Sequence, residues 1–249
     1  MKQAAREYRR PKTLESVPTH YCPGCGHGIA HRLVAEVIDE LGIAERTVGM
    51  APVGCAVLAY DYFKIDMCEA PHGRTPAVAT GIKRARPECI VFSYQGDGDL
   101  AAIGTAEIIH AANRGENISV FFVNNAVYGM TGGQMAPTTP NGAKTTTSPY
   151  GRNPKTEGHP IKVAELLANF ESVVYSARTS LSSPKNVRET KRAIRKSFQA
   201  QIDNRGFSIV EVLSPCPTYW HMTPEAAMKE IDEVMSKVFP LGVYKDWEK

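Results

Sequence analysis

Short apolar runs alternate along this chain with longer stretches in which apolar residues recur at helical spacing. The runs at 90–94 and 118–123 are rich in β-branched and aromatic residues and end in turn residues, which predicts two buried strands. Between them, the apolar residues from Leu100 to Ala112 have the spacing of a helix that packs on a sheet. Residues 90–123 are therefore predicted to form a strand–helix–strand unit.

The same alternation continues on both sides of this unit. Apolar spacing and flanking Gly or Pro residues predict further helices at 29–41, 74–86, 161–170, 184–202 and 223–239. Further strands are predicted at 47–50, 172–177 and 208–213. Alternating strands and helices predict the α/β class, with a doubly wound, mostly parallel sheet and helices on both faces.

Three segments do not follow the alternation. Residues 1–20 are polar and are predicted to form an N-terminal arm, which leaves 21–249 as a single domain. Residues 56–71 give no clear pattern. Gly and Pro interrupt residues 131–160 repeatedly, and a loop of this length in a compact domain is usually functional or interfacial. Its hydroxyls at 145–148 and the cation of Arg152 could face a bound ligand; the alternative is a loop that only covers the surface.

Composition narrows the function classes only slightly. Hydrophobic content of 43%, charged content of 22% and a net charge of +3 are ordinary for a globular protein and give no argument for a nucleic-acid partner. No apolar run approaches the length of a membrane span, and the first 20 residues lack the apolar stretch of a secretory signal. A cytoplasmic protein without a membrane partner is expected.

Polar residues follow both strands of the central unit. The segment 96–99 (GDGD) follows the first strand, and Asn124 and Asn125 follow the second. The glycines allow the backbone to approach a ligand closely, and the start of the next helix suits a phosphate or diphosphate. Asp97 and the side-chain oxygen of Asn125 can bind one hard cation such as Mg²⁺, which would offset the repulsion between carboxylates and phosphates. The alternative is a doubly wound fold in which Gly-Asp-Gly is an ordinary turn.

The six cysteines point to metal or redox chemistry more than to disulfides, given the expected cytoplasmic location. Cys22 and Cys25 form a C-x-x-C motif, and Cys55 and Cys216 lie in turns that contain Gly or Pro. Cys89, at the start of a buried strand, is predicted to be a core thiol, and Cys68 has no motif.

The spacing of Gly96-Asp97-Gly98 and Asn125 resembles the thiamine-diphosphate signature. The segment 128–134 (YGMTGGQ) resembles the β subunit of the 2-oxoacid:ferredoxin oxidoreductases. The resemblance implies the thiamine-diphosphate-binding fold, with Mg²⁺ held by Asp97, Asn125 and the Val127 carbonyl. It implies these cofactor-binding residues: Gly54, Cys55, His72, Gly73, Gly96, Asp97, Gly98, Asp99, Asn125, Val127, Gly129, Met130 and Thr131.

The resemblance also gives roles to individual side chains. His72 is the candidate catalytic residue, and the glutamate that activates the cofactor is expected from a partner subunit, because Glu107 is predicted to face away from the strand ends. His27 is a candidate for a hydrogen bond to a cluster or for orienting its loop, whereas His31 and His110 are expected to be structural. The four thiols that resemble ligands of a [4Fe-4S] cluster are Cys22, Cys25, Cys55 and Cys216. A zinc site and a C-x-x-C dithiol are the alternatives.

The implied reaction is oxidative decarboxylation of a 2-oxoacid with coenzyme A and ferredoxin, a reaction of anaerobic metabolism. The implied partners are an α subunit, with γ and δ subunits as further candidates. Some family members that take 2-oxoglutarate carry a Lys just after the cofactor loop, where this chain has Gly132-Gly133-Gln134. The missing cation favours a branched-chain acid, 3-methyl-2-oxobutanoate, over 2-oxoglutarate or pyruvate.

Three rival functions remain open at this point. A non-oxidative thiamine-dependent lyase would need no cluster thiols. A zinc or electron-transfer protein without catalysis would not need Asp97 and Asn125. A stand-alone nucleotide-binding module is supported by little beyond the Gly-rich turn.

Overall fold

A seven-stranded sheet forms the centre of the computed structural model, which describes residues 9–248. The strand order is β2-β1-β3-β4-β8-β7-β9; β9 pairs antiparallel with β7, and every other neighbouring pair is parallel. The strands are β1 (Thr47–Ala51), β2 (Asp66–Glu69), β3 (Ile90–Gly96), β4 (Ser119–Asn124), β7 (Val173–Ser180), β8 (Phe207–Leu213) and β9 (Gly242–Asp246). The predicted mostly parallel, doubly wound sheet is confirmed.

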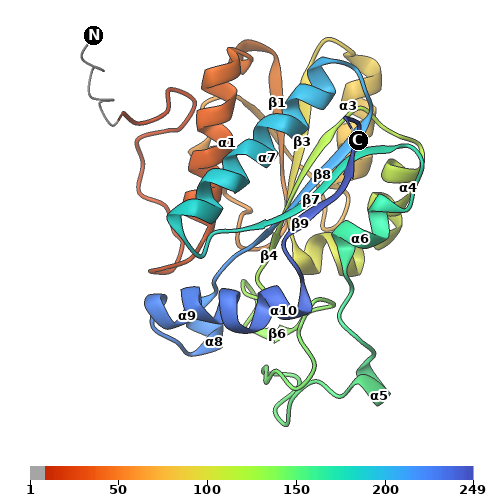
Figure 1. Ribbon diagram of the computed structural model, residues 1–249. Helices are drawn as coiled ribbons and strands as arrows, with labels where there is room; N and C mark the ends of the chain where they lie inside the picture. Colours follow the sequence, from red (N-terminus) through yellow and green to blue (C-terminus); the bar gives the residue numbers. More distant parts are fainter. Residues whose placement is uncertain (1–8, 249) are drawn as a thin grey trace.

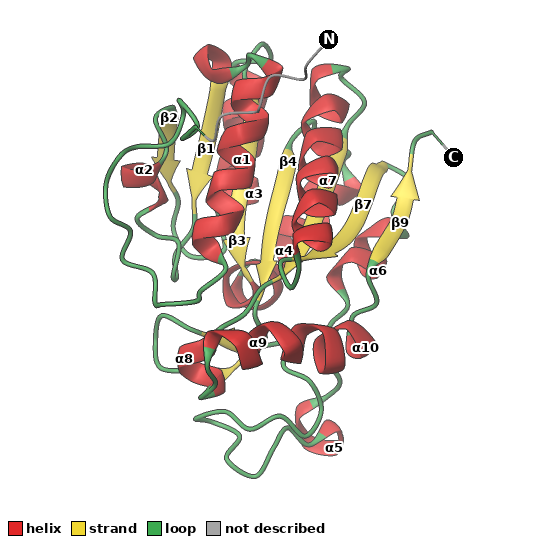
Figure 2. Cartoon of the chain, turned by 60° about the vertical axis from the view of Figure 1, so that its left-hand side comes forward, coloured by secondary structure: helices red, strands yellow, loops and turns green. Residues whose placement is uncertain are grey.

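Helices cover both faces of this sheet (Figure 1). One face carries α1 (His27–Leu41) and α7 (Pro184–Ile202), which lie side by side in Figures 1 and 2. The opposite face carries α3 (Thr75–Ala85), α4 (Thr105–Asn113) and α6 (Val163–Ala168). Side chains alternate accordingly along β3, where Phe92 faces α1 and α7 and Val91 faces the other layer.

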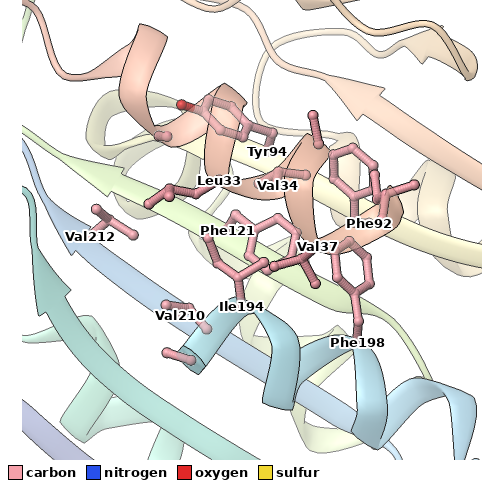
Figure 3. Close-up of a cluster of buried hydrophobic side chains, with 14 of the residues drawn as sticks. Leu33, Val34, Val37, Phe92, Tyr94, Phe121, Ile194, Phe198, Val210 and Val212 are labelled. Atoms are coloured by element: carbon pink, nitrogen blue, oxygen red, sulfur yellow. The ribbon is translucent and has the colours of Figure 1, made fainter. Parts of the chain in front are cut away.

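Figure 3 shows the core between the sheet and the α1–α7 layer. Val37 of α1 and Phe198 of α7 pack onto Phe92 and Phe121, which come from the neighbouring strands β3 and β4. The Phe121 and Phe198 ring centroids are 5.1 Å apart in an edge-on arrangement, a favourable geometry for aromatic rings. This packing fixes β3 and β4, and with them the loops at their carboxyl ends.

The predicted helix after Gly98 is interrupted. Residues Asp99–Ile103 form the π-helical turn η2, and α4 begins only after Gly104. A Cβ on Gly104 would lie 2.4 Å from the Asp99 carbonyl oxygen and 2.7 Å from that of Gly73. The interruption therefore lets two loops meet at the start of the helix.

A further layer covers the carboxyl end of the sheet (Figure 2). It contains α8 (Pro217–Trp220), α9 (Pro224–Glu230), the π-helical turn η3 (Ile231–Met235) and α10 (Ser236–Val238), so the helix predicted at 223–239 is continuous but includes a π turn. Residues 131–160 lie beside this layer. They contain β6 (Gln134–Met135), which pairs with β5 (Val127–Tyr128), and the short helix α5 (Pro154–Glu157).

The unassigned segment 56–71 and part of the predicted arm lie against one another. The segment forms α2 (Ala59–Tyr62) and β2, and the turn η1 (Ala44–Arg46) precedes β1. Leu14 forms an isolated bridge with Phe63, and the Thr13 hydroxyl donates to the Ala35 carbonyl at 3.1 Å. Residues 1–8 of the arm lie outside the described residues, and the boundary at residue 20 stays a prediction. Over the described range, the chain has no helix whose length and apolarity would let it cross a membrane.

Candidate functional site

A cavity of about 130 Å³ opens at the carboxyl ends of β1, β3 and β4. The chain proceeds from β1 to β2 in one direction and from β3 to β4 in the other, so the β1–β3 crevice is a topological switch point, where α/β sheets bind ligands. Twelve of the thirteen predicted cofactor-binding residues line the cavity, namely Gly54, Cys55, His72, Gly96, Asp97, Gly98, Asp99, Asn125, Val127, Gly129, Met130 and Thr131.

Gly73 is the exception, because it packs beneath the cavity lining. Its φ is +78°, and a Cβ there would lie 2.6 Å from the Gly104 nitrogen. The cavity is also lined by four residues for which the sequence predicted no role, Pro52, Val53, Ala56 and Tyr128. The Tyr128 ring lies over Gly98, where a Cβ would come within 2.0 Å of it. Gly98 therefore allows this aromatic ring to cover one side of the cavity.

Asp97 is buried and held by two hydrogen bonds. Its Oδ1 accepts from the Gly98 N–H at 2.9 Å, and its Oδ2 accepts from the Thr138 hydroxyl at 2.9 Å. Burial raises the pKa of Asp97 to about 7, although these hydrogen bonds act in the opposite direction. A bound cation would favour the ionised form. No motif in the sequence pointed to Thr138.

The turn after β4 presents the other predicted oxygen ligands. The Asn125 side-chain oxygen accepts from the Val127 N–H at 3.3 Å, and the Trp220 indole donates to the Asn125 carbonyl at 3.1 Å. Between them, Ala126 has a φ of +63°, a left-handed conformation that non-glycine residues rarely adopt. This turn places both Asn125 and Val127 in the cavity lining.

These donors fit magnesium by their chemistry. A carboxylate, an amide oxygen and a main-chain carbonyl are hard ligands, and phosphate oxygens with water would complete an octahedral shell. Within residues 9–248, no group of three or more His, Cys, Asp and Glu side chains is arranged to hold a metal ion. Asp97 would thus be the one carboxylate of a mixed set with Asn125 and Val127.

Asp99 holds the loops around the cavity together. One oxygen, Oδ1, accepts from the Gly73 N–H at 2.8 Å and lies 2.5 Å from Nδ1 of His72, while Oδ2 accepts from Gln95 at 2.6 Å. The Val53 N–H also donates to it, at 3.3 Å. Asp99 therefore orients His72 and the loops after β1 and before α3.

The four predicted cluster thiols come from three loops, and in the described residues no three of them are arranged to hold a metal ion. A Cβ on Gly129 would lie 3.0 Å from the Cys55 sulfur and 3.8 Å from the Cys216 sulfur, so both sulfur atoms approach the same point beside the cavity. Gly24, inside the C-x-x-C motif, packs on Pro224 and Pro217, next to Cys216. All six cysteines of the chain are free thiols.

The burial of these thiols and one unpaired hydroxyl beside them favour a metal centre over isolated thiols. Burial, with smaller contributions from neighbouring thiols, raises the pKa of Cys55 to about 12 and that of Cys216 to about 11, so a cationic centre would be needed to hold them as thiolates. The buried Ser214 hydroxyl has no hydrogen-bond partner and lies against Gly26 of the C-x-x-C loop. A cluster sulfide or thiolate would give that hydroxyl an acceptor.

The other two cysteines take no part in this group. Cys68, on β2, contacts the Glu69 carbonyl at 3.5 Å. Cys89 was predicted to be a core thiol; it is only half-buried, at the edge of the core before β3.

Two predicted roles can be compared with the structure directly. The His27 ring is buried, lines the cavity and lies 2.9 Å from the Tyr94 hydroxyl through Nδ1; burial lowers its pKa to about 4, so it is neutral. The Arg152 guanidinium donates to six main-chain carbonyls within residues 136–159. The expectation that Arg152 offers a cation to a ligand is therefore wrong, because its donors hold the loop itself.

Comparison with known proteins shows the family of the chain. Residues 52–212 match the thiamine pyrophosphate enzymes, C-terminal TPP binding domain. The chain is 54% identical over 248 residues to the ketoisovalerate oxidoreductase subunit VorA of Methanothermobacter thermautotrophicus, covering 96% of this chain and 52% of the relative. It is 37% identical over 227 residues to the 2-oxoglutarate synthase subunit KorB of Archaeoglobus fulgidus, covering 91% and 80%.

A solved structure shares the architecture. It is a 2-oxoglutarate:ferredoxin oxidoreductase from Magnetococcus marinus with 2-oxoglutarate, coenzyme A and succinyl-CoA bound; the TM-score is 0.77 at 25% identity, covering 97% of this chain and 86% of that one. The fold is thus that of a thiamine pyrophosphate-binding domain. Within that class, the chain belongs to the 2-oxoacid:ferredoxin oxidoreductase family. It spans about half the length of the VorA relatives it matches.

Proposed function

We propose that this chain is the β-type, cofactor-binding subunit of a 2-oxoacid:ferredoxin oxidoreductase. Its substrate would be a branched-chain acid, 3-methyl-2-oxobutanoate, converted with coenzyme A to acyl-CoA and CO₂ while two electrons pass to ferredoxin. The observation that carries the proposal is the position of Gly129. This residue lines the cofactor cavity, and the Cys55 and Cys216 sulfur atoms lie beside it. A carbon-chemistry site and a thiol site therefore share one backbone turn.

Thiamine diphosphate would supply carbanion stabilisation after CO₂ leaves. Asp97, Asn125 and the Val127 carbonyl would hold Mg²⁺ and through it the diphosphate. Asp99 would keep His72 and the surrounding loops in place, since it already bonds to all of them. The Tyr128 ring, packed on Gly98, would exclude water from one side.

Cys22, Cys25, Cys55 and Cys216 would hold a [4Fe-4S] cluster. A redox-inert zinc ion would have no part in a reaction that releases electrons next to it, which favours iron over zinc. The exposed thiol among the four is Cys22, whereas Cys216 is buried. The Cys22 side is therefore where electrons would leave toward a ferredoxin or a further subunit.

A partner α subunit would complete the site. Glu107 forms an ion pair with Arg74 at 2.7 Å and does not line the cavity, so the glutamate that activates the cofactor is expected from another chain. The substrate choice is supported by the VorA relatives, which are named for ketoisovalerate, and by the absence of a cation at 132–134. 2-Oxoglutarate is the second candidate, because the KorB relatives are named for it.

The test separates the two sites in protein purified without oxygen together with its partner chains. Asp97→Ala should abolish Mg²⁺-dependent thiamine diphosphate binding, measured by calorimetry, while about four irons and four sulfides per chain remain. Cys216→Ser should remove the visible iron–sulfur absorption while cofactor binding remains. Asp61→Ala and Cys68→Ser, substitutions outside both sites, are the matched controls.

Several outcomes would contradict the proposal. Equal loss of cofactor and iron in both variants would contradict two separate sites. Zinc or no metal in the wild-type protein would remove the electron path, and a non-oxidative thiamine-dependent lyase would become the better description. Substrate preference can be measured as the rate at which the enzyme reduces an artificial electron-acceptor dye. A faster rate with 2-oxoglutarate than with 3-methyl-2-oxobutanoate would overturn the substrate choice alone.

A further inference from the structure

Two adjacent threonines of the long loop contact both halves of the predicted metal site. Thr138 donates its hydroxyl to Asp97 Oδ2 at 2.9 Å, and Thr139 donates its hydroxyl to the Ala126 carbonyl at 2.6 Å. Both side chains are completely buried. Asp97 follows β3, whereas Ala126 lies in the turn after β4, so this pair connects the ends of two neighbouring strands.

The residue that accepts the hydrogen bond from Thr139, Ala126, has a strained backbone conformation. Ala126 has a φ of +63° and separates Asn125 from Val127, which are the two predicted ligands of that turn. A left-handed non-glycine residue persists only where its surroundings hold it. The Thr139 hydroxyl also accepts from the Ala136 N–H at 2.8 Å, so it is fixed on both sides.

Arg152 holds the segment that carries the two threonines. Its Nη1 donates to the carbonyls of Pro137 at 2.9 Å and Thr139 at 2.7 Å, and it also reaches Ala136. Its other nitrogens donate to carbonyls at 157–159. One buried guanidinium therefore ties the beginning of the loop to its end and limits the movement of Thr138 and Thr139.

We propose that Thr138 and Thr139 are positioning residues for the metal ligands, and that Arg152 acts through them. Thr138 sets the rotation of the Asp97 carboxylate, and Thr139 holds the left-handed turn that carries Asn125 and Val127. Groups that hydrogen-bond to metal ligands commonly change metal affinity 10- to 100-fold when removed. The inference rests on the proposed Mg²⁺–thiamine diphosphate site, and it assigns a task to the long loop.

The test is the Mg²⁺ affinity of the protein, with its partner chains and saturating thiamine diphosphate. Binding can be followed by the fluorescence of Trp220, whose indole bonds to the Asn125 carbonyl. Thr138→Val keeps the shape but removes the hydroxyl, and it should raise the Kd for Mg²⁺ about 10-fold or more. Thr138→Ser keeps the hydroxyl and should stay within about threefold of wild type. Thr190→Val removes a similarly buried hydroxyl from α7 and is the matched control.

The same measurement tests Thr139 and Arg152. Thr139→Val should weaken Mg²⁺ binding and Thr139→Ser should restore it. Arg152→Lys should also weaken it. Adding Arg152→Lys to the double variant Thr138→Val/Thr139→Val should cause no further loss, because contacts that act in series do not add. Additive losses would overturn the role given to Arg152.

The outcomes separate this inference from the function on which it rests. Wild-type affinity in Thr138→Val would overturn the positioning role while the cofactor site stands. No Mg²⁺-dependent binding in the wild-type protein would overturn both. An equal loss in Thr138→Val and Thr138→Ser would show that packing, rather than the hydroxyl, matters, and would also overturn the proposal.

Discussion

Buried histidines beside the C-x-x-C loop show how single residues set the behaviour of this protein with pH. The His31 ring stacks on Phe63 with centroids 4.8 Å apart, and its Nε2 lies 3.0 Å from the Tyr21 hydroxyl. Its Nδ1 is buried without a hydrogen-bond partner. Burial, with smaller contributions from nearby histidines, therefore lowers the pKa of His31 well below its usual value of 6.5.

This shift predicts a loss of stability in mild acid. Below pH 6.5 the unfolded chain binds a proton at this position and the native chain does not, so the free energy of unfolding falls by up to about 1.4 kcal/mol per pH unit for His31. His31→Gln should reduce that slope between pH 6.5 and 5.5, measured by urea unfolding at each pH. His110→Gln, an exposed histidine of α4, is the control. An unchanged slope in His31→Gln would contradict the interpretation.

At this scale the sequence indicated candidate residues but could not predict their contacts. Asp97, Asn125 and the cysteines could be named because their local spacing is distinctive. Thr138 could not, since a threonine in a Pro-rich loop gives the same local pattern whether it bonds to Asp97 or to water. Arg152 was named for contact with a ligand, but its donors bind the loop itself. Asp99 was expected to contact the cofactor; it lines the cavity, yet its oxygens bond to the surrounding loops.

Helix α7 is more than a cover for the sheet, because its last turn pairs with a strand. The Gln201 side chain accepts from the Val91 N–H at 2.6 Å and donates to the Val91 carbonyl at 2.9 Å. It also donates to the Ser119 hydroxyl at 3.0 Å. The pairing of β3 with β4 begins at Phe92 and Ser119. The Gln201 amide therefore supplies Val91 with the hydrogen bonds that a neighbouring strand would otherwise provide, one residue before that pairing starts.

Replacing this amide should therefore weaken the centre of the sheet. Gln201→Leu would leave a buried N–H and a buried C=O of Val91 without partners, at a cost of about 2–4 kcal/mol in the free energy of unfolding. Urea unfolding would measure this loss, and amide exchange at Val91 should become faster. Gln199 lies two positions earlier on the same helix, and its side chain donates to the exposed Asp203 at 2.7 Å. Gln199→Leu should therefore change the free energy of unfolding by less than about 1 kcal/mol. Equal effects of the two substitutions would rule out a special role for Gln201.

Elements with strong periodicity were predicted well, and those with little were not. The runs that became β3 and β4 are apolar because both of their faces are covered. Strand β9 was missed because its residues are exposed or half-buried and alternate weakly. The break between η2 and α4 was also missed, since it depends on the approach of Gly73 to Gly104, a contact between loops.

At the scale of the whole molecule, the order of elements places the site. Strands that follow one another as alternating βα units must twist into a parallel sheet, and the reversal of direction between β1 and β3 opens a crevice at one predictable edge. The sequence could therefore predict that the GDGD and Asn turns lie together. No local pattern relates residues 214–217 to residues 22–25, which pack against each other; their proximity was expected only because the family resemblance gives both segments cluster ligands.

The antiparallel strand β9 has a consequence for solubility. It covers the hydrogen-bonding edge of β7, a long and well-buried strand, and Arg178 of β7 bonds to the Pro240 carbonyl at 3.1 Å and the Tyr244 hydroxyl at 2.7 Å. Removing residues 240–249 would bare that edge, and bare edges template intermolecular pairing. The shortened protein should self-associate, which concentration-dependent light scattering would detect. If the shortened chain scatters like the full one, β7 tolerates water at its edge. If it self-associates, the last strand prevents the sheet of one molecule from pairing with the sheet of the next.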